Sequence, residues 1–115
     1  MPNKKFLVSV LVINYNKEMF ISRCLDSLVK QNFKNFEVIF SDDSSKDNSI
    51  DIASKYKKKL SLKIVKGINR TKYGCYNQIN SISRAFKKSS GELIMFLDSD
   101  DFFHKKKNID CCEIF

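Results

Sequence analysis

The chain has 115 residues, of which 43% are hydrophobic and 30% charged, and a formal net charge of +8. This composition is typical of one folded domain with a single hydrophobic core, and it argues against a disordered or repetitive chain. No segment stays apolar for the roughly 20 residues that a membrane-spanning helix needs, so we expect a cytoplasmic protein.

Two clusters of lysines stand out, at residues 55–59 and 105–107, with few aromatic residues between them. Such clusters are usually solvated surfaces, so we predict no nucleic-acid partner. A basic face would nevertheless favour peripheral association with anionic lipid at the inner membrane surface.

The cysteines lack C-x-x-C spacing, and together with His104 they fit no zinc pattern. Free thiols are therefore predicted at Cys24, Cys75, Cys111 and Cys112.

In chain order, the first predicted element is a buried strand, Leu7–Ile13. Lys4 and Lys5 precede it as they would in a signal peptide, but no small-residue cleavage site follows. The next segment predicts a helix with one apolar face, formed by Phe20, Ile21, Cys24, Leu25, Leu28 and Val29.

A second strand is predicted at Phe36–Ser41, and a short helix capped by Asp47 or Asn48 follows it. Leu60–Val65 is the third predicted strand, and residues 66–74 are a predicted loop. The last predicted helix carries Tyr76, Ile79, Ile82 and Phe86 at helical spacing. Small residues at 89–91 end this helix before the fourth strand, Glu92–Leu97.

Strands that alternate with helices indicate an α/β fold, here an open, doubly wound, mostly parallel sheet of the Rossmann-like type. The first and fourth strands are almost continuously apolar, as a sheet covered by helices on both faces requires. We expect the strand order 3-2-1-4. No linker or repeat interrupts the series, so one domain is predicted over residues 1–115.

Polar residues follow three of the four strands, at the carboxyl ends where open α/β sheets bind their ligands. They are Asn14, Tyr15 and Asn16 after the first strand, Asp42 and Asp43 after the second, and Asp98, Ser99, Asp100 and Asp101 after the fourth. Three neighbouring carboxylates repel one another unless a cation offsets their charge. Mg²⁺ or Mn²⁺ typically takes one or two carboxylates and completes its shell with water and phosphate oxygens. A metal and a phosphate are therefore expected at Asp98, Asp100 and Asp101.

Three segments together resemble the beginning of a family 2 glycosyltransferase of the GT-A type. They are "VSVLVINYN" (residues 8–16), "FKNFEVIFSDDSSKDNS" (33–49) and "SSGELIMFLDSDD" (89–101), in the order that the family has them. The resemblance implies a donor site for a nucleotide sugar, usually a UDP-sugar, whose sugar goes to a cell-surface polysaccharide or lipid-linked acceptor.

By the same resemblance, residues 14–16 line the nucleotide cleft with Tyr15 near the base, and Asp43 accepts a hydrogen bond from uracil. Asp98 and Asp100 match the D-x-D motif, which contacts ribose and metal, and Asp101 lies close behind.

The chain departs from the family pattern at several positions. Ile13 stands where a proline is usual, and Ser44 replaces a turn glycine. The family often has an Arg-Asn pair at residues 82–83, so Arg70 or Lys72 is the candidate here for that contact with the donor. The resemblance also implies an acceptor half with a carboxylate base, and residues 102–115 do not resemble it, so we expect a truncated domain with no identified catalytic base.

Two other classes fit parts of the sequence. "IMFLDSDD" also matches the nucleophile strand of haloacid-dehalogenase-type phosphatases, but that family places the motif on its first strand. A non-catalytic nucleotide-binding or interaction module is the second alternative. The fourth strand, Glu92–Leu97, is apolar and would lie at a sheet edge, so it could also pair with a second copy in a homodimer.

Overall fold

The structure is a computed structural model that describes residues 7–67 and 70–100. Its elements in order are β1 (Val8–Asn14), α1 (Glu18–Val29), β2 (Phe36–Asp42), α2 (Ser49–Ser54), the 3₁₀ turn η1 (Lys55–Lys58), β3 (Leu62–Lys66), α3 (Gly74–Lys88) and β4 (Leu93–Asp98). Every predicted strand and helix is present, and the strand ends differ from the predicted ones by at most two residues.

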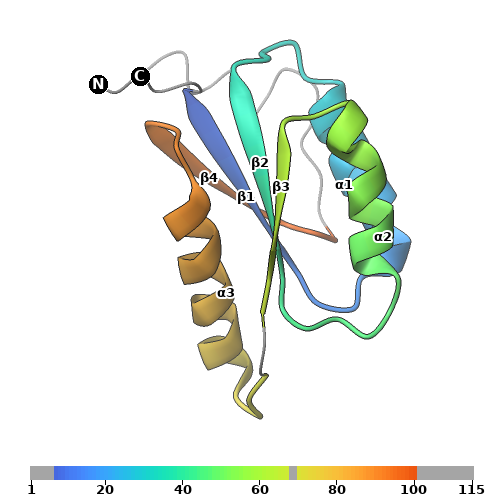
Figure 1. Cartoon of the computed structure of the whole chain (residues 1–115), viewed down its shortest axis with the longest axis vertical. Helices are drawn as coiled ribbons and strands as arrows, with labels where there is room; N and C mark the ends of the chain where they lie inside the picture. The colour runs from blue at the N-terminus through green and yellow to red at the C-terminus, as the bar shows by residue number, and fades with distance from the viewer. Residues whose placement is uncertain (1–6, 68–69, 101–115) are drawn as a thin grey trace.

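The sheet is fully parallel and has the order β3-β2-β1-β4, as predicted. Figure 1 shows α1 and α2 on one face of the sheet and α3 on the other, which is the doubly wound arrangement. The strand order reverses between β1 and β4, where Ile13 pairs with Asp98, and on the other side Asn14 pairs with Asp42. The polar strand ends therefore meet at one edge of the sheet.

Alternation along the strands divides the core into two layers. Val8, Val10 and Val12 of β1 point toward α1 and pack with its buried residues, whereas Leu11 points toward α3. Of the predicted apolar face of α1, Ile21, Cys24, Leu25 and Leu28 are buried.

The buried face of α3 is not the one that its apolar residues suggest. Asn77, Ser81 and Ala85 face the sheet, whereas Tyr76, Ile79 and Phe86 are each more than half exposed. Small residues let the helix approach β2 closely enough for hydrogen bonds between the two elements. The Ser41 hydroxyl lies 2.7 Å from the Ser81 hydroxyl and donates to the Ser81 carbonyl at 2.9 Å. Close packing through small polar groups thus decides the helix rotation.

A buried carboxylate closes the amino end of the sheet. Glu37 accepts hydrogen bonds from the Ser9 hydroxyl at 2.6 Å and from the backbone N–H and hydroxyl of Ser90 at 2.6 and 3.0 Å, and Lys63 lies 3.5 Å away. Burial alone would raise the pKa of Glu37, but these hydrogen bonds and the lysine outweigh it, so the pKa is lowered from its usual value. Glu37 thereby ties β1, β2 and the loop before β4 together.

Within the described part of the chain, no helix is long and apolar enough to cross a membrane. Neither Cys24, which is buried, nor Cys75, which is exposed, forms a disulfide there. Cys111, Cys112 and His104 lie outside the described residues.

Candidate functional site

A cavity of about 270 Å³ opens at the carboxyl ends of β1, β2 and β4. Its lining contains seven of the residues predicted from the sequence: Asn14, Tyr15, Asp43, Arg70, Asp98, Ser99 and Asp100. The remaining lining residues are Ile13, Lys17, Gly74, Gln78 and Ser81. Asp101 lies outside the described residues, so its predicted role as a metal ligand stays a prediction.

At one end of the cavity, a buried carboxylate is held by two arginines. Asp43 is 4% exposed, and its two oxygens lie 2.5 Å from Nη1 of Arg70 and 3.2 Å from Nη2 of Arg84. The guanidinium of Arg70 also lies over the ring of Tyr15, with its central carbon 3.5 Å from the ring centroid. An acceptor, a flat cation and an aromatic face are thus brought together, which suits a flat polar ring such as a nucleobase.

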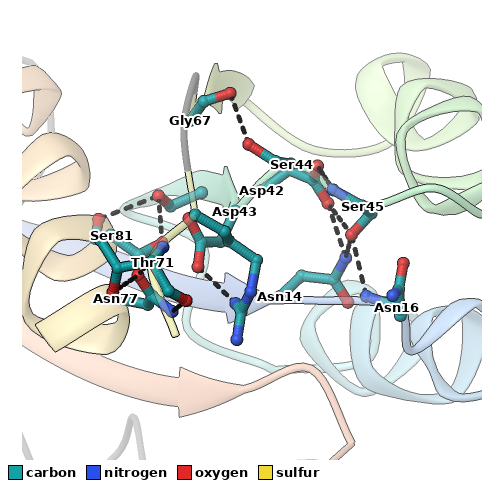
Figure 2. Close-up of polar contacts among 12 residues, drawn as sticks. Asn14, Asn16, Asp42, Asp43, Ser44, Ser45, Gly67, Thr71, Asn77 and Ser81 are labelled. Atoms are coloured by element: carbon teal, nitrogen blue, oxygen red, sulfur yellow. Dashed lines mark hydrogen bonds and ion pairs between the residues drawn. The ribbon is translucent and has the colours of Figure 1, made fainter. Parts of the chain in front are cut away.

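Asn16 and Asp42 do not line the cavity but brace its wall (Figure 2). Asp42 accepts hydrogen bonds from Asn14 Nδ2 at 2.8 Å and from the Ser45 hydroxyl at 2.6 Å, and the Ser45 hydroxyl in turn accepts the backbone N–H of Asn16 at 2.8 Å. The side-chain oxygen of Asn16 accepts the N–H of Lys46 at 2.8 Å. These bonds join the loops after β1 and β2.

Two residues of these loops have a left-handed backbone, Asn16 with φ 51° and Ser44 with φ 62°. Asparagine tolerates this conformation, but serine is strained in it. Ser44 is the position where the family usually has glycine, and its hydroxyl compensates in part by donating to the carbonyl of Gly67 at 3.0 Å (Figure 2). That bond also fastens the segment after β3 to the site.

The starts of α1 and α2 share one cap. Asp47 accepts the backbone N–H of Glu18 at 3.1 Å and that of Ser49 at 3.0 Å, together with the Ser49 hydroxyl. The Glu18 carboxylate returns a bond by accepting the N–H of Asn48 at 2.7 Å. Burial tends to raise the pKa of Asp47, but the Ser49 hydroxyl and the backbone N–H groups outweigh it and lower the pKa. Of the two predicted candidates, Asn48 holds the N-cap position of α2 but makes no side-chain hydrogen bond there, whereas Asp47, one residue earlier, accepts the first N–H of α2 and also that of α1.

The segment before α3 is fixed by an asparagine. Asn77 is buried, accepts the N–H and hydroxyl of Thr71 at 2.8 and 2.9 Å, and donates to the Thr71 carbonyl at 2.8 Å (Figure 2). Thr71 follows Arg70, so these bonds fix the main chain next to the arginine that pairs with Asp43. Lys72, the other candidate from the sequence, does not line the cavity but lies 5.4 Å from the ring centroid of Tyr73.

At the other end of the cavity, Asp98 and Asp100 carry exposed carboxylates. Lys17 pairs with Asp100 at 3.6 Å, and Arg23 of α1 donates to the Asp100 carbonyl at 2.8 Å. Ser99 is buried, and its N–H bonds the carbonyl of Ile13 at 3.1 Å, which continues the β1–β4 pairing past the strand end. No group of three or more metal-ligating side chains occurs among residues 7–67 and 70–100.

Sequence reasoning missed Ile13, Lys17, Gly74, Gln78 and Ser81 as lining residues. A signal was available for the last two, because Gln78 and Ser81 lie three residues apart on the polar side of α3. Lys17 gave no such signal, since one lysine among 21 basic residues does not stand out.

Comparison with known proteins agrees with this geometry. The model of the family described as "Glycosyl transferase family 2" matches residues 9–109. The poly(ribitol-phosphate) beta-N-acetylglucosaminyltransferase TarS of Staphylococcus aureus is 39% identical over 100 residues, which are 85% of this chain and 17% of that protein. A poly(ribitol-phosphate) beta-glucosyltransferase of Bacillus spizizenii is 41% identical over 103 residues, which are 83% of this chain and 15% of that protein.

Among solved structures, residues 1–349 of S. aureus TarS in complex with UDP-GlcNAc superpose with a TM-score of 0.80 at 35% identity. The match covers 94% of this chain and 30% of that one. The chain thus spans less than a third of the length of each of these matched chains. The sequence match, the sheet order and the polar strand ends lead to one conclusion: the chain belongs to glycosyl transferase family 2.

Proposed function

We propose that the chain binds a nucleotide diphosphate sugar, most simply a UDP-sugar, together with Mn²⁺ or Mg²⁺, as the donor site of a glycosyltransferase. The observation that carries the proposal is the separation of two chemistries within one cavity. Tyr15 and the buried carboxylate of Asp43 lie at one end, and the exposed carboxylates of Asp98 and Asp100 lie at the other.

In this proposal the base lies against Tyr15 and donates its ring N–H to Asp43. The two arginines orient the Asp43 carboxylate and offset its charge, because a buried carboxylate needs nearby positive charge. Arg70 now covers Tyr15, so the base either displaces its guanidinium or stacks with it. The ribose and diphosphate then extend past Ser99 toward Asp98 and Asp100.

The residues present fit a hard divalent cation. Asp98 and Asp100 supply two oxygen ligands, and Mg²⁺ or Mn²⁺ bound by nucleotides commonly has only one or two carboxylate ligands. A bound cation would neutralise the charge that develops on the leaving nucleoside diphosphate. The protein's own part is to hold these carboxylates at the strand end and to orient the nucleotide.

Transfer also needs a group that takes the proton from the acceptor hydroxyl. Within the described residues, the only carboxylates that line the cavity are Asp43, Asp98 and Asp100, and all three have other roles in this proposal. The base must therefore come from elsewhere, and a nucleotide-binding module without activity is the second candidate for the chain by itself.

The acceptor class in the proposal is a cell-surface polymer or lipid-linked glycan. Both relatives named above act on poly(ribitol-phosphate) according to their names, which supports a polyol-phosphate polymer. We place this reaction at the inner membrane surface, where the basic turn η1, with Lys55, Lys57 and Lys58, would favour anionic lipid.

Calorimetry with uridine and UDP, with Mn²⁺ or with chelator, tests the donor site. Asp43→Asn should weaken the binding of uridine roughly ten-fold or more, with or without cation, because a hydrogen bond to a charged group contributes about 1.5–3 kcal/mol. Asp100→Asn should weaken only the Mn²⁺-dependent part of UDP binding. Asp51→Asn, on α2 and outside the cavity, removes the same charge and should change neither uridine binding nor the Mn²⁺-dependent part of UDP binding.

Uridine binding that is unaffected by Asp43→Asn would contradict the base site, and equal UDP binding with Mn²⁺ and with chelator would contradict the cation. Assays of UDP-sugar hydrolysis and transfer with acceptor extracts then separate an active donor site from a binding module.

A further inference from the structure

We infer that Lys17 is a built-in counter-cation of the D-x-D segment, which a divalent cation must displace, so that this lysine sets the metal affinity of the donor site. The inference rests on the proposed function, and it adds a residue that neither the motif nor the family resemblance pointed to.

The fold brings Lys17 and Asp100 together in the lining of the cavity. Lys17 directly precedes α1 and Asp100 follows β4, yet both line the cavity, with Nζ 3.6 Å from Oδ2. Their side chains are 47% and 45% exposed, so water reaches the pair. Exposed ion pairs of this kind are weak and exchange readily for a stronger partner.

The charges around the cavity leave this role to Lys17. Two described cations line it, Lys17 and Arg70, and Arg70 is engaged with Asp43 and Tyr15 at the base end. At the Asp98–Asp100 end, Lys17 is therefore the described lining cation, and it pairs with the Asp100 carboxylate. An ammonium group and a divalent cation cannot share one carboxylate at close range without repulsion.

The backbone of this segment has a separate tether. Arg23 donates to the carbonyl of Asp100 rather than to its carboxylate, at 2.8 Å. The carboxylate of Asp100 can therefore leave Lys17 while α1 still holds the main chain in place. Arg23 is a positioning residue in this scheme, and Lys17 is the group that is exchanged.

The test measures Mn²⁺ alone, through the loss of the free Mn²⁺ signal in electron paramagnetic resonance, for the chain and its variants. Lys17→Met should tighten Mn²⁺ binding roughly five- to ten-fold, because it removes both the competing partner and a repelling charge. Lys17→Arg keeps the charge and should bind Mn²⁺ as the parent chain does. Lys58→Met, on η1 and outside the cavity, lowers the net charge equally and should change the affinity less than two-fold.

The gain from Lys17→Met should shrink in 1 M salt, where the Debye length falls to about 3 Å. Asp100→Asn should weaken Mn²⁺ binding and remove most of this gain, because the carboxylate for which the lysine and the metal compete is gone. Asp100→Asn alone and Asp100→Asn combined with Lys17→Met should therefore bind Mn²⁺ with nearly equal affinity. Unchanged or weaker Mn²⁺ binding by Lys17→Met would overturn the inference.

UDP binding in chelator, measured on the same samples, separates this failure from that of the proposed function. If UDP binds but no variant binds Mn²⁺, the inference and the metal assignment are overturned while the base site stands. If UDP does not bind either, the proposed function itself is contradicted.

Discussion

Replacing Gly91 by alanine tests how closely β4 approaches β1. A Cβ atom at this position would lie 2.6 Å from the backbone N and the hydroxyl of Ser9 and 2.7 Å from the carbonyl carbon of Val8. Gly91 does not have a positive φ, so the effect of alanine would be steric rather than conformational. The contacted backbone belongs to a strand with neighbours on both sides and cannot move aside alone.

Overpacking a rigid site costs about 1–3 kcal/mol. The forced shift would also strain the bond from the Gly91 N–H to the Ser9 hydroxyl, now 2.7 Å, which adds about 1 kcal/mol. We therefore expect Gly91→Ala to lower the free energy of unfolding by about 3 kcal/mol, out of about 5–15 kcal/mol for a typical domain. Because β1–β4 pairing sets Asp98 opposite Ile13, UDP binding should weaken as well.

Urea unfolding followed by circular dichroism measures the effect, and the other two glycines of the chain provide graded controls. A Cβ on Gly74 would meet nothing within 4 Å, so Gly74→Ala should leave stability unchanged or raise it by up to about 1 kcal/mol. A Cβ on Gly67 would meet the flexible end of Arg84, so Gly67→Ala should be intermediate. A loss below about 1 kcal/mol for Gly91→Ala would refute the packing argument.

Three further changes test other parts of the molecule. Glu37→Gln should destabilise the chain at neutral pH and make its stability fall less steeply in acid. A carboxylate with a lowered pKa stabilises the fold above its unfolded pKa and loses this effect as the pH falls through the folded pKa. If the free energy of unfolding of the variant runs parallel to that of the parent from about pH 3 to 7, this reasoning is contradicted. Asn77→Ala should cost about 2 kcal/mol and weaken UDP binding, because three bonds to Thr71 are lost; unchanged calorimetric affinity would show that this loop does not shape the site. Phe96→Lys should abolish any self-association through β4, since Phe96 is 59% exposed on that edge strand. If sedimentation velocity shows the same concentration dependence for the parent chain and the variant, a β4 dimer is excluded.

The strands and the residues at their ends could be predicted because a strand that is buried on both faces needs a run of apolar residues, which is visible in the sequence. Nearly continuous apolar runs such as Leu7–Ile13 indicated the sheet, and the polar residues that follow them indicated the cavity. The orientation of α3 could not be predicted in this way, since Ile79 and Phe86 have helical spacing but small residues face the sheet.

Contacts between distant residues within the site also could not be predicted from the sequence. Arg70 was one of two basic candidates, and only the fold shows that it reaches both Asp43 and Tyr15. The sequence shows that Ser44 stands where the family pattern has a glycine. The hydrogen bond from its hydroxyl to Gly67, which partly compensates for the left-handed backbone, depends on how β3 ends. Such contacts join residues more than 20 positions apart, which no local pattern records.

The bonds that join the loops after β1 and β2 have a consequence for how ligand affinity and folding are related. Asp42 and Ser45 hold Asn14 and Asn16, so this wall of the cavity loses its conformational freedom when the chain folds rather than when a ligand arrives. A nucleotide would then meet a surface that is already ordered, and little of its binding free energy would be spent on arranging loops. Substitutions that break these bonds should therefore lower both the melting temperature and the ligand affinity.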